Sequence, residues 1–77
     1  MKVSIVSPEK TLYKGEADIV KLPGEKGRFE VLNGHAPIIS TLTEGTVECV
    51  GVEAFSTPVH GGFVQVMRNE VCICVEV

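Results

Sequence analysis

The stretch that decides the fold runs from Gly27 to Ser40 and reads GRFEVLNGHAPIIS. Apolar and charged residues alternate over 28–31, which is the period of a half-buried strand. Asn33-Gly34 follows, the pair best able to adopt positive φ in a tight turn. Ile38-Ile39 then predicts a second, buried strand. We interpret the segment as two strands that meet at a sharp corner, where His35 is displayed.

The rest of the chain repeats short apolar alternations separated by glycine or proline. We expect further strands at 3–6, 11–14, 19–22, 46–50, 52–56, 59–67 and 71–77. Bends, turns or breaks are expected at Gly15-Glu16, Pro23-Gly24, Thr57-Pro58 and Arg68-Asn69. No stretch carries apolar residues at helical spacing over three turns. The pattern predicts an all-β fold, a small antiparallel sandwich or barrel.

Length and charge limit what the chain can be. Its 77 residues predict a single domain, 1–77, and a chain of this size buries only about 60% of its unfolded surface. A net charge of −3 with scattered lysines and arginines disfavours a nucleic-acid partner, which requires a clustered basic face. The sequence lacks both an apolar run long enough to span a membrane and a signal-peptide pattern. We therefore expect the protein to stay in the compartment where it is made.

The last predicted strand, 71–77, reads VCICVEV and is apolar on both faces over 71–75. Such a strand belongs inside a sheet and needs cover on both sides. A second sheet could supply all of that cover, which is the favoured interpretation, or another polypeptide could supply part. Cys72 and Cys74 should share one face, where a disulfide seldom fits. An odd count of three cysteines predicts buried or half-buried thiols in a reducing compartment.

Groups that could carry catalysis are few. His35 and His60 lack the spacing of a metal site, so neither a metal nor a cofactor is expected. Cys49 or Cys72 would be a nucleophile only beside a cation or a helix N-terminus that lowers the thiol pKa. His60-Gly61-Gly62 resembles a phosphate-binding loop, but such loops lead into a helix, and here a strand is expected. The residues therefore favour a binding module over an enzyme, with no catalytic residue.

Four segments occur in an order that resembles the epsilon subunit of bacterial F-type ATP synthase. They are Ser7-Pro8-Glu9, 22–27, 33–39 and 61–64, and the most specific run is LPGEKGRFEVLNGHAP. The resemblance extends over about residues 3–76 and covers only that family's N-terminal β-domain. It implies a flattened sandwich of two roughly five-stranded sheets.

The resemblance also implies a function. A non-catalytic rotor subunit of this kind clamps the gamma subunit of the central stalk to the ring of c subunits, and so couples ion translocation to ATP synthesis. It implies no bound nucleotide and a peripheral position at the cytoplasmic face of the bacterial inner membrane. By position, Ser7, His35 and Ser40 match places that face gamma. The tip Glu25, Lys26, Gly27 and Arg28 matches the loop that approaches the c ring, although relatives often carry an acidic or polar residue at the place of Arg28.

The family's usual C-terminal helical hairpin, which can block ATP hydrolysis, has no counterpart in these residues, so we expect little or no inhibition by this chain. Two other classes of function stay open. One is a free-standing small-ligand or carbohydrate-binding β module, for which one Tyr, three Phe and no Trp are poor material. The other is an enzyme with a cysteine nucleophile, which labelling of the thiols would test.

Overall fold

The computed structural model describes all 77 residues and contains nine β-strands. They are β1 (Lys2–Val6), β2 (Thr11–Glu16), β3 (Ile19–Gly24), β4 (Gly27–Leu32), β5 (Ile38–Leu42), β6 (Gly45–Val50), β7 (Phe55–Val59), β8 (Gly61–Met67) and β9 (Glu70–Glu76). None of these elements is a helix long and apolar enough to cross a membrane. The all-β prediction is confirmed.

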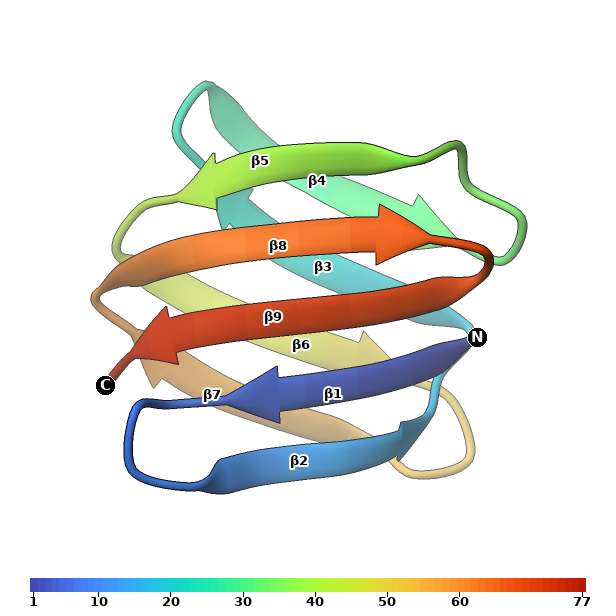
Figure 1. Ribbon diagram of the computed structural model, residues 1–77, viewed down its shortest axis with the longest axis horizontal. Helices are drawn as coiled ribbons and strands as arrows, with labels where there is room; N and C mark the ends of the chain where they lie inside the picture. The colour runs from blue at the N-terminus through green and yellow to red at the C-terminus, as the bar shows by residue number, and fades with distance from the viewer.

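The strands lie in two layers (Figure 1). The front layer has the order β2-β1-β9-β8-β5, and the back layer consists of β4, β3, β6 and β7. The layers join at one corner, where Gly24 of β3 pairs with Leu42 of β5. All neighbouring strands are antiparallel except β1 and β9, which are parallel. The predicted sandwich is confirmed, with the two layers hydrogen-bonded into one continuous sheet.

The core consists of the inward-facing residues of both layers. In β9 these are Val71, Ile73 and Val75, each at most 2% exposed. The other buried apolar side chains are Met1, Val3, Ile5, Ala17, Val20, Leu22, Val31, Leu42, Val47, Cys49, Val59, Val64 and Val66. Full burial of a Val, Leu or Ile side chain contributes about 1.5–3 kcal/mol. The alternation of side chains along each strand therefore decides which residues are buried and stabilise the sandwich.

Strand direction decides which loops share an end of the sandwich. Since β8 is antiparallel to both β5 and β9, and β1 is parallel to β9, the strands β1, β5 and β9 run the same way. The loop before β5, which holds His35, therefore lies at one end with the β8–β9 turn. The loop that begins at Ser7 lies at the other end, together with the β3–β4 tip (Figure 1).

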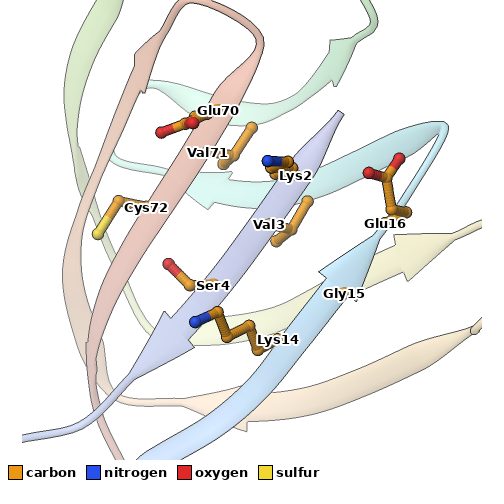
Figure 2. A pocket seen from close by; sticks show the side chains of 9 residues that line it. All are labelled: Lys2, Val3, Ser4, Lys14, Gly15, Glu16, Glu70, Val71 and Cys72. Carbon is orange, nitrogen blue, oxygen red and sulfur yellow. The ribbon is translucent and has the colours of Figure 1, made fainter.

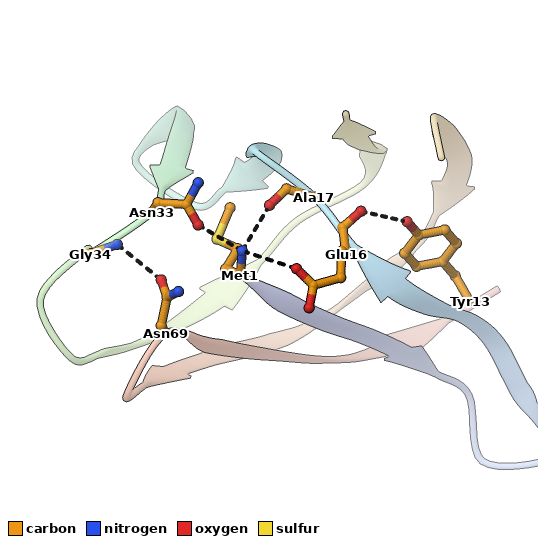
Figure 3. A network of polar contacts seen from close by, with 7 residues as sticks. All are labelled: Met1, Tyr13, Glu16, Ala17, Asn33, Gly34 and Asn69. Carbon is orange, nitrogen blue, oxygen red and sulfur yellow. Dashed lines mark hydrogen bonds and ion pairs between the residues drawn. The ribbon is translucent and has the colours of Figure 1, made fainter. Parts of the chain in front are cut away.

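Polar contacts connect the loops at the His35 end (Figure 3). The Gly34 N–H donates to the Asn69 side-chain oxygen at 2.9 Å, and the Met1 amine donates to the Asn33 side-chain oxygen at 2.6 Å. Arg68 and Asn69 have φ of 52° and 61°, and Gly34 has φ of 79°. Positive φ at both central residues characterises the hairpin turn whose twist matches its strands. The turns predicted at Asn33-Gly34 and Arg68-Asn69 are confirmed.

The turn predicted at Pro23-Gly24 is wrong, because β3 continues through both residues. Pro23 pairs with Arg28 and Gly24 with Gly27, so the chain turns at 25–26 instead. Proline has no N–H to donate, but its carbonyl can still accept, and that of Pro23 accepts from the Thr43 N–H at 2.8 Å. The bend or bulge predicted at Gly15-Glu16 is also absent, since both residues lie within β2 and pair regularly with β1. The register shifts elsewhere in this pair of strands: Ile5 pairs with Tyr13 and Val6 with Thr11, which leaves Leu12 of β2 as the extra residue.

The strand predicted at 52–56 is wrong as well. Residues 51–54 form a loop, in which Val52 is 99% exposed, and β7 contains the Thr57-Pro58 pair that was expected to break a strand. Because β7 is an edge strand that pairs only with β6, a proline there need not interrupt a ladder. The strand β7 ends at Val59, and β8 begins at Gly61 after a bend at His60.

Candidate functional site

The outer face of the front layer presents apolar side chains to solvent, and we call it the open sheet face. Its apolar members are Val6 of β1, Ile39 of β5, Phe63 and Met67 of β8, and Cys72 and Cys74 of β9. Ile39 is 74% exposed, and Phe63 and Met67 are each 46% exposed. Contiguous exposed apolar patches mark interaction sites on soluble proteins.

The strand register makes this surface continuous. Across one row, Phe63 pairs with Cys74, and Cys74 pairs with Val6. In the next row, Ile39 pairs with Gln65, and Gln65 pairs with Cys72. Side chains directly opposite on neighbouring strands lie about 4.5–5.5 Å apart at Cβ. Five of the six members therefore lie in two adjacent rows that extend over four strands, with Gln65 between Ile39 and Cys72. Met67 lies in the following row, opposite Glu70.

The position of β9 explains why the patch exists. As predicted, β9 lies inside the sheet, between β1 and β8. The back layer covers its inner residues, whereas on the outer side Cys72 is exposed and Cys74 is half-buried. The favoured expectation that a second sheet covers both faces of this strand is wrong, because a two-layer sandwich covers only inner faces. For the same reason Ile39, expected to be buried, points outward, while its neighbour Ile38 is half-buried.

Burial raises the pKa of the cysteine thiols in two different places. In the core, burial raises the pKa of Cys49 to about 11. On the open sheet face, burial raises the pKa of Cys74, and the neighbouring Cys72 thiol raises it further. A nucleophilic cysteine needs the opposite shift, because the thiolate is the reactive form. Neither Cys49 nor Cys74 therefore has the environment of an activated nucleophile.

Towards β2 the open sheet face ends in a shallow hollow with a charged rim (Figure 2). Lys2, Lys14, Glu16 and Glu70 line it together with Cys72. The register sets Lys2 between Glu16 on one side and Glu70 on the other. An apolar centre with a polar, charged rim is the usual composition of a protein–protein interface.

The structure does not bring Ser7, His35 and Ser40 together. Ser7 follows β1, where its hydroxyl donates to the Lys10 carbonyl and accepts from the Lys10 N–H, both at 3.2 Å. His35 lies at the opposite end, with its Nδ1 2.7 Å from the Ala36 carbonyl oxygen. Ser40 pairs with the buried Val64, so it belongs to the inner side of β5.

These three residues also differ in what surrounds them. Ser7 lines a hollow with Val6 and Phe63, so it borders the open sheet face. Ser40 lines a separate hollow with the tip residues Glu25 to Gly27. A single partner in contact with both Ser7 and His35 would have to extend along the strands, over a molecule that measures 26 × 25 × 17 Å.

The tip residues Glu25, Lys26, Gly27 and Arg28 are all exposed. The Arg28 side chain, however, turns onto the outer face of the back layer. There its Nη1 donates to the Thr46 carbonyl at 2.7 Å, and its Nη2 donates to Glu48 Oε2 at 2.9 Å. Glu25 and Lys26 remain as the charged side chains that the tip presents.

The aromatic residues do not line a common groove. Tyr13 and Phe55 stack on one another with ring centroids 4.9 Å apart, Phe29 packs against the core, and Phe63 lies alone on the open sheet face. Ligand sites of the carbohydrate-binding kind depend on aromatic side chains that converge on one cleft. The dispersal of these rings disfavours the free-standing ligand-binding module.

Sequence reasoning pointed to the Ile38-Ile39 pair and the last strand as candidate interface surfaces, but it did not single out Phe63 or Met67. The alternation of β8 separates Phe63, Gln65 and Met67 from the buried Val64 and Val66. The alternation of side chains is visible in the sequence. It separates the two faces of the strand, but it does not predict which face a second layer will cover. The available signal was that the large aromatic Phe63 lies two residues from the polar Gln65, on the same face of β8.

The fold defines a small β-sandwich domain that has an exposed apolar face on one layer. A family model described as "ATP synthase, Delta/Epsilon chain, beta-sandwich domain" matches residues 1–77, and the chain belongs to this family.

Curated relatives agree with this assignment. An ATP synthase epsilon chain of Leptospira borgpetersenii is 45% identical over 74 residues, which are 95% of this chain and 58% of the relative. That of Caulobacter vibrioides is 40% identical over 74 residues, 95% of this chain and 86% of the relative. The chain thus spans a little over half the length of the Leptospira protein.

Solved structures share the fold. A chain in the Tetrahymena thermophila mitochondrial ATP synthase, in a structure of its central stalk and c ring, superposes with a TM-score of 0.87 at 15% identity, over 99% of this chain and 63% of that one. A chain in the Euglena gracilis mitochondrial ATP synthase gives 0.86 at 21% identity, over 95% of this chain and 48% of that one. At these identities the likeness establishes the architecture alone.

Proposed function

We propose that the chain is the β-sandwich of an ATP synthase epsilon subunit, a non-catalytic part of the central stalk that holds the gamma subunit against the c ring. The observation that carries the proposal is the open sheet face, an uncovered apolar patch with a charged rim on a member of this family. Residues 1–77 would act as one domain, peripheral to the membrane on its cytoplasmic side.

The open sheet face is the surface we assign to gamma. Ile39, Phe63 and Met67 supply exposed apolar area at its centre, which is where permanent interfaces concentrate their binding energy. Ser7 and His35 mark its two ends, so gamma would lie along the strands. A helix of about 17 residues, at a rise of 1.5 Å per residue, is as long as the 26 Å length of the molecule.

We assign the tip to the c ring, through Glu25 and Lys26. They lie on a tight turn of a two-stranded hairpin, where β3 and β4 pair over their whole length, and a paired hairpin deforms less than a free loop. Arg28 contributes from behind, because its hydrogen bonds to Thr46 and Glu48 fasten the start of β4 to β6. A rigid projection is suited to transmit torque.

The assignment of the open sheet face can be tested with the native thiol of Cys72. In the free chain Cys72 is exposed and should react readily with a maleimide. In complex with gamma its labelling rate should fall at least about tenfold, since a docked partner excludes the reagent. A matched control is Ser56→Cys, on the exposed outer side of β7 in the back layer, whose labelling should not change. Equal labelling of Cys72 in the free and bound chain would refute the docking surface.

The assignment of the tip needs a separate measurement. Glu25→Lys combined with Lys26→Glu preserves net charge and should leave binding to gamma unchanged. Binding of the chain–gamma complex to the c ring should weaken, because the charges that face the ring are exchanged. Unchanged affinity for the c ring would exclude the two side chains from that contact.

A further inference from the structure

Residues 33–37, which we call the His35 loop, connect β4 in the back layer to β5 in the front layer (Figure 1). All of its residues are exposed except His35, which is half-buried, and none belongs to the core. The loop makes a single backbone hydrogen bond, from the His35 N–H to the Leu32 carbonyl at 3.1 Å. A segment with so few contacts of its own opens locally at low free-energy cost, unless other elements hold it.

Two side-chain amides attach the His35 loop to remote parts of the fold (Figure 3). The Met1 amine donates to the Asn33 side-chain oxygen at 2.6 Å, across 32 positions of the sequence. The Gly34 N–H donates to the Asn69 side-chain oxygen at 2.9 Å, across 35 positions. The polar contacts of His35 itself are local, since its Nδ1 lies against the carbonyl of the next residue. The position of the loop therefore depends on these two amides.

Asn69 is itself held in place by the sheet. It lies in the turn of the β8–β9 hairpin, whose strands pair without interruption, and its carbonyl accepts from the Lys2 N–H at 3.1 Å. The residues on either side of this turn are Met67, a member of the open sheet face, and Glu70, part of its charged rim. The Asn69 side chain therefore connects the His35 loop to the surface that we assign to gamma.

We propose that Asn69 is a positioning residue for docking, which holds the His35 loop in its binding conformation through the Gly34 N–H. The inference rests on the proposed function, because it takes gamma as the partner that covers both the open sheet face and His35. A loop that is ordered before binding loses less conformational entropy when the partner docks. The bond is exposed, and a single hydrogen bond has a modest net effect. Its removal should therefore weaken docking without abolishing it.

The proposal is tested with Asn69→Gly, which removes the side chain but keeps the turn, because glycine readily adopts the φ of 61° found there. In the chain alone, exchange of the Gly34 amide with water, measured by NMR, should become about three- to tenfold faster, the effect of losing one hydrogen bond. The Kd for gamma should rise by a similar factor. Asn69→Asp keeps an acceptor oxygen at the same place, so it should retain wild-type exchange and affinity.

Arg68→Gly is the matched control for the exchange measurement, because Arg68 has φ of 52° in the same turn and makes no hydrogen bond to the loop. It should leave exchange at Gly34 unchanged. The urea midpoint of Asn69→Gly should equal that of the wild-type chain, and a lower midpoint would make the role of Asn69 purely structural.

Unchanged exchange at Gly34 in Asn69→Gly would overturn the inference, and so would faster exchange with an unchanged Kd for gamma. In both cases the wild-type chain still binds gamma, so the proposed function stands. A wild-type chain that does not bind gamma would overturn the proposed function, and this inference with it.

Discussion

The outer faces of the two layers share the same alternating pattern but carry opposite kinds of residue. The open sheet face is apolar at its centre, whereas the back layer carries a charged row, with Lys21 set in register between Glu30 and Glu48. Arg28 crosses that face to reach Glu48. Charged side chains suit a surface that stays in water, and exposed apolar ones suit a surface that another molecule covers. This contrast is the reason why we assign the binding side to the front layer.

The back face is not wholly polar. At the His35 end, Leu32 and Val50 flank Ile19 in register, with exposed fractions of 49% for Leu32 and 41% for Val50. This group occupies a single row, while the open sheet face extends over neighbouring rows of four strands. Because the apolar group on the back face is small, Val50 in this group is a suitable control for Ile39 on the open sheet face.

The largest expected effect concerns the backbone of the two layers. Gly62 of β8 has φ of 141°, and a Cβ there would overlap the Cys74 carbonyl oxygen and lie 2.9 Å from the Val75 Cα. Gly62→Ala should therefore lower the free energy of unfolding by at least about 3 kcal/mol. Gly27 in the back layer has φ of 127° but nothing within 4 Å of its Cβ position, so Gly27→Ala should cost about 1–2 kcal/mol. Urea unfolding measures both, and equal losses would contradict the close approach of β8 and β9.

A charge placed on each face tests which one docks. Ile39→Lys should weaken binding to gamma by at least about 30-fold, the effect of losing a hot-spot residue of about 2 kcal/mol. Val50→Lys, the matched change on the back face, should leave affinity within about twofold, because surface substitutions away from an interface have effects within about 0.5 kcal/mol. Calorimetric titration with gamma compares them. A larger loss for Val50→Lys would reverse the assignment of the faces.

The buried thiol of the back layer predicts a dependence of stability on pH. Because the pKa of Cys49 is raised from 9.0 to about 11, the unfolded chain loses this proton at lower pH than the folded chain. Stability should therefore fall as the pH rises above about 9, by about 1 kcal/mol at pH 10 from this thiol. Tyr13 and Cys74, whose pKa values are also raised, act in the same direction. Comparison with Cys49→Ala isolates the core thiol, and parallel pH profiles for the two proteins would refute this contribution.

The smallest effect is expected on the charged side of the comparison. The side chains of Arg28 and Glu48 are 43% and 44% exposed, and a pair so accessible to water contributes at most about 0.5 kcal/mol. Glu48→Gln should lower the free energy of unfolding by no more than that, and 1 M salt should reduce the difference further. A loss above about 1.5 kcal/mol in urea would indicate that charge pairing organises the back face.

Much of the fold follows from local pattern, as β9 illustrates. Its alternation predicts Val71, Ile73 and Val75 on one face and the two cysteines on the other, and the structure agrees. Two of the errors arose at proline. Pro23 and Pro58 resemble strand ends in sequence, yet both lie within strands. Whether a missing N–H matters depends on which strand lies beside it, and that neighbour is remote in sequence.

The candidate site was less accessible to prediction. Ser7, His35 and Ser40 were chosen by position, and the structure separates them between two ends and an inner face. The direction of Arg28 depends on Thr46 and Glu48, about 20 residues away in the chain. A side chain that points outward from a strand becomes buried or exposed only through what packs above it.

The sequence by itself determined the all-strand architecture, the division of each strand into two faces and the turns at Asn33-Gly34 and Arg68-Asn69. These features depend on the two-residue period of a strand and on allowed φ values, which are properties of adjacent residues. Only the tertiary structure decided that β9 lacks cover on its outer side, that Ile39 and Phe63 join the cysteines in one patch, and that the tip retains Glu25 and Lys26 as its free charges. Those features depend on contacts between strands far apart in the chain, which no local pattern encodes.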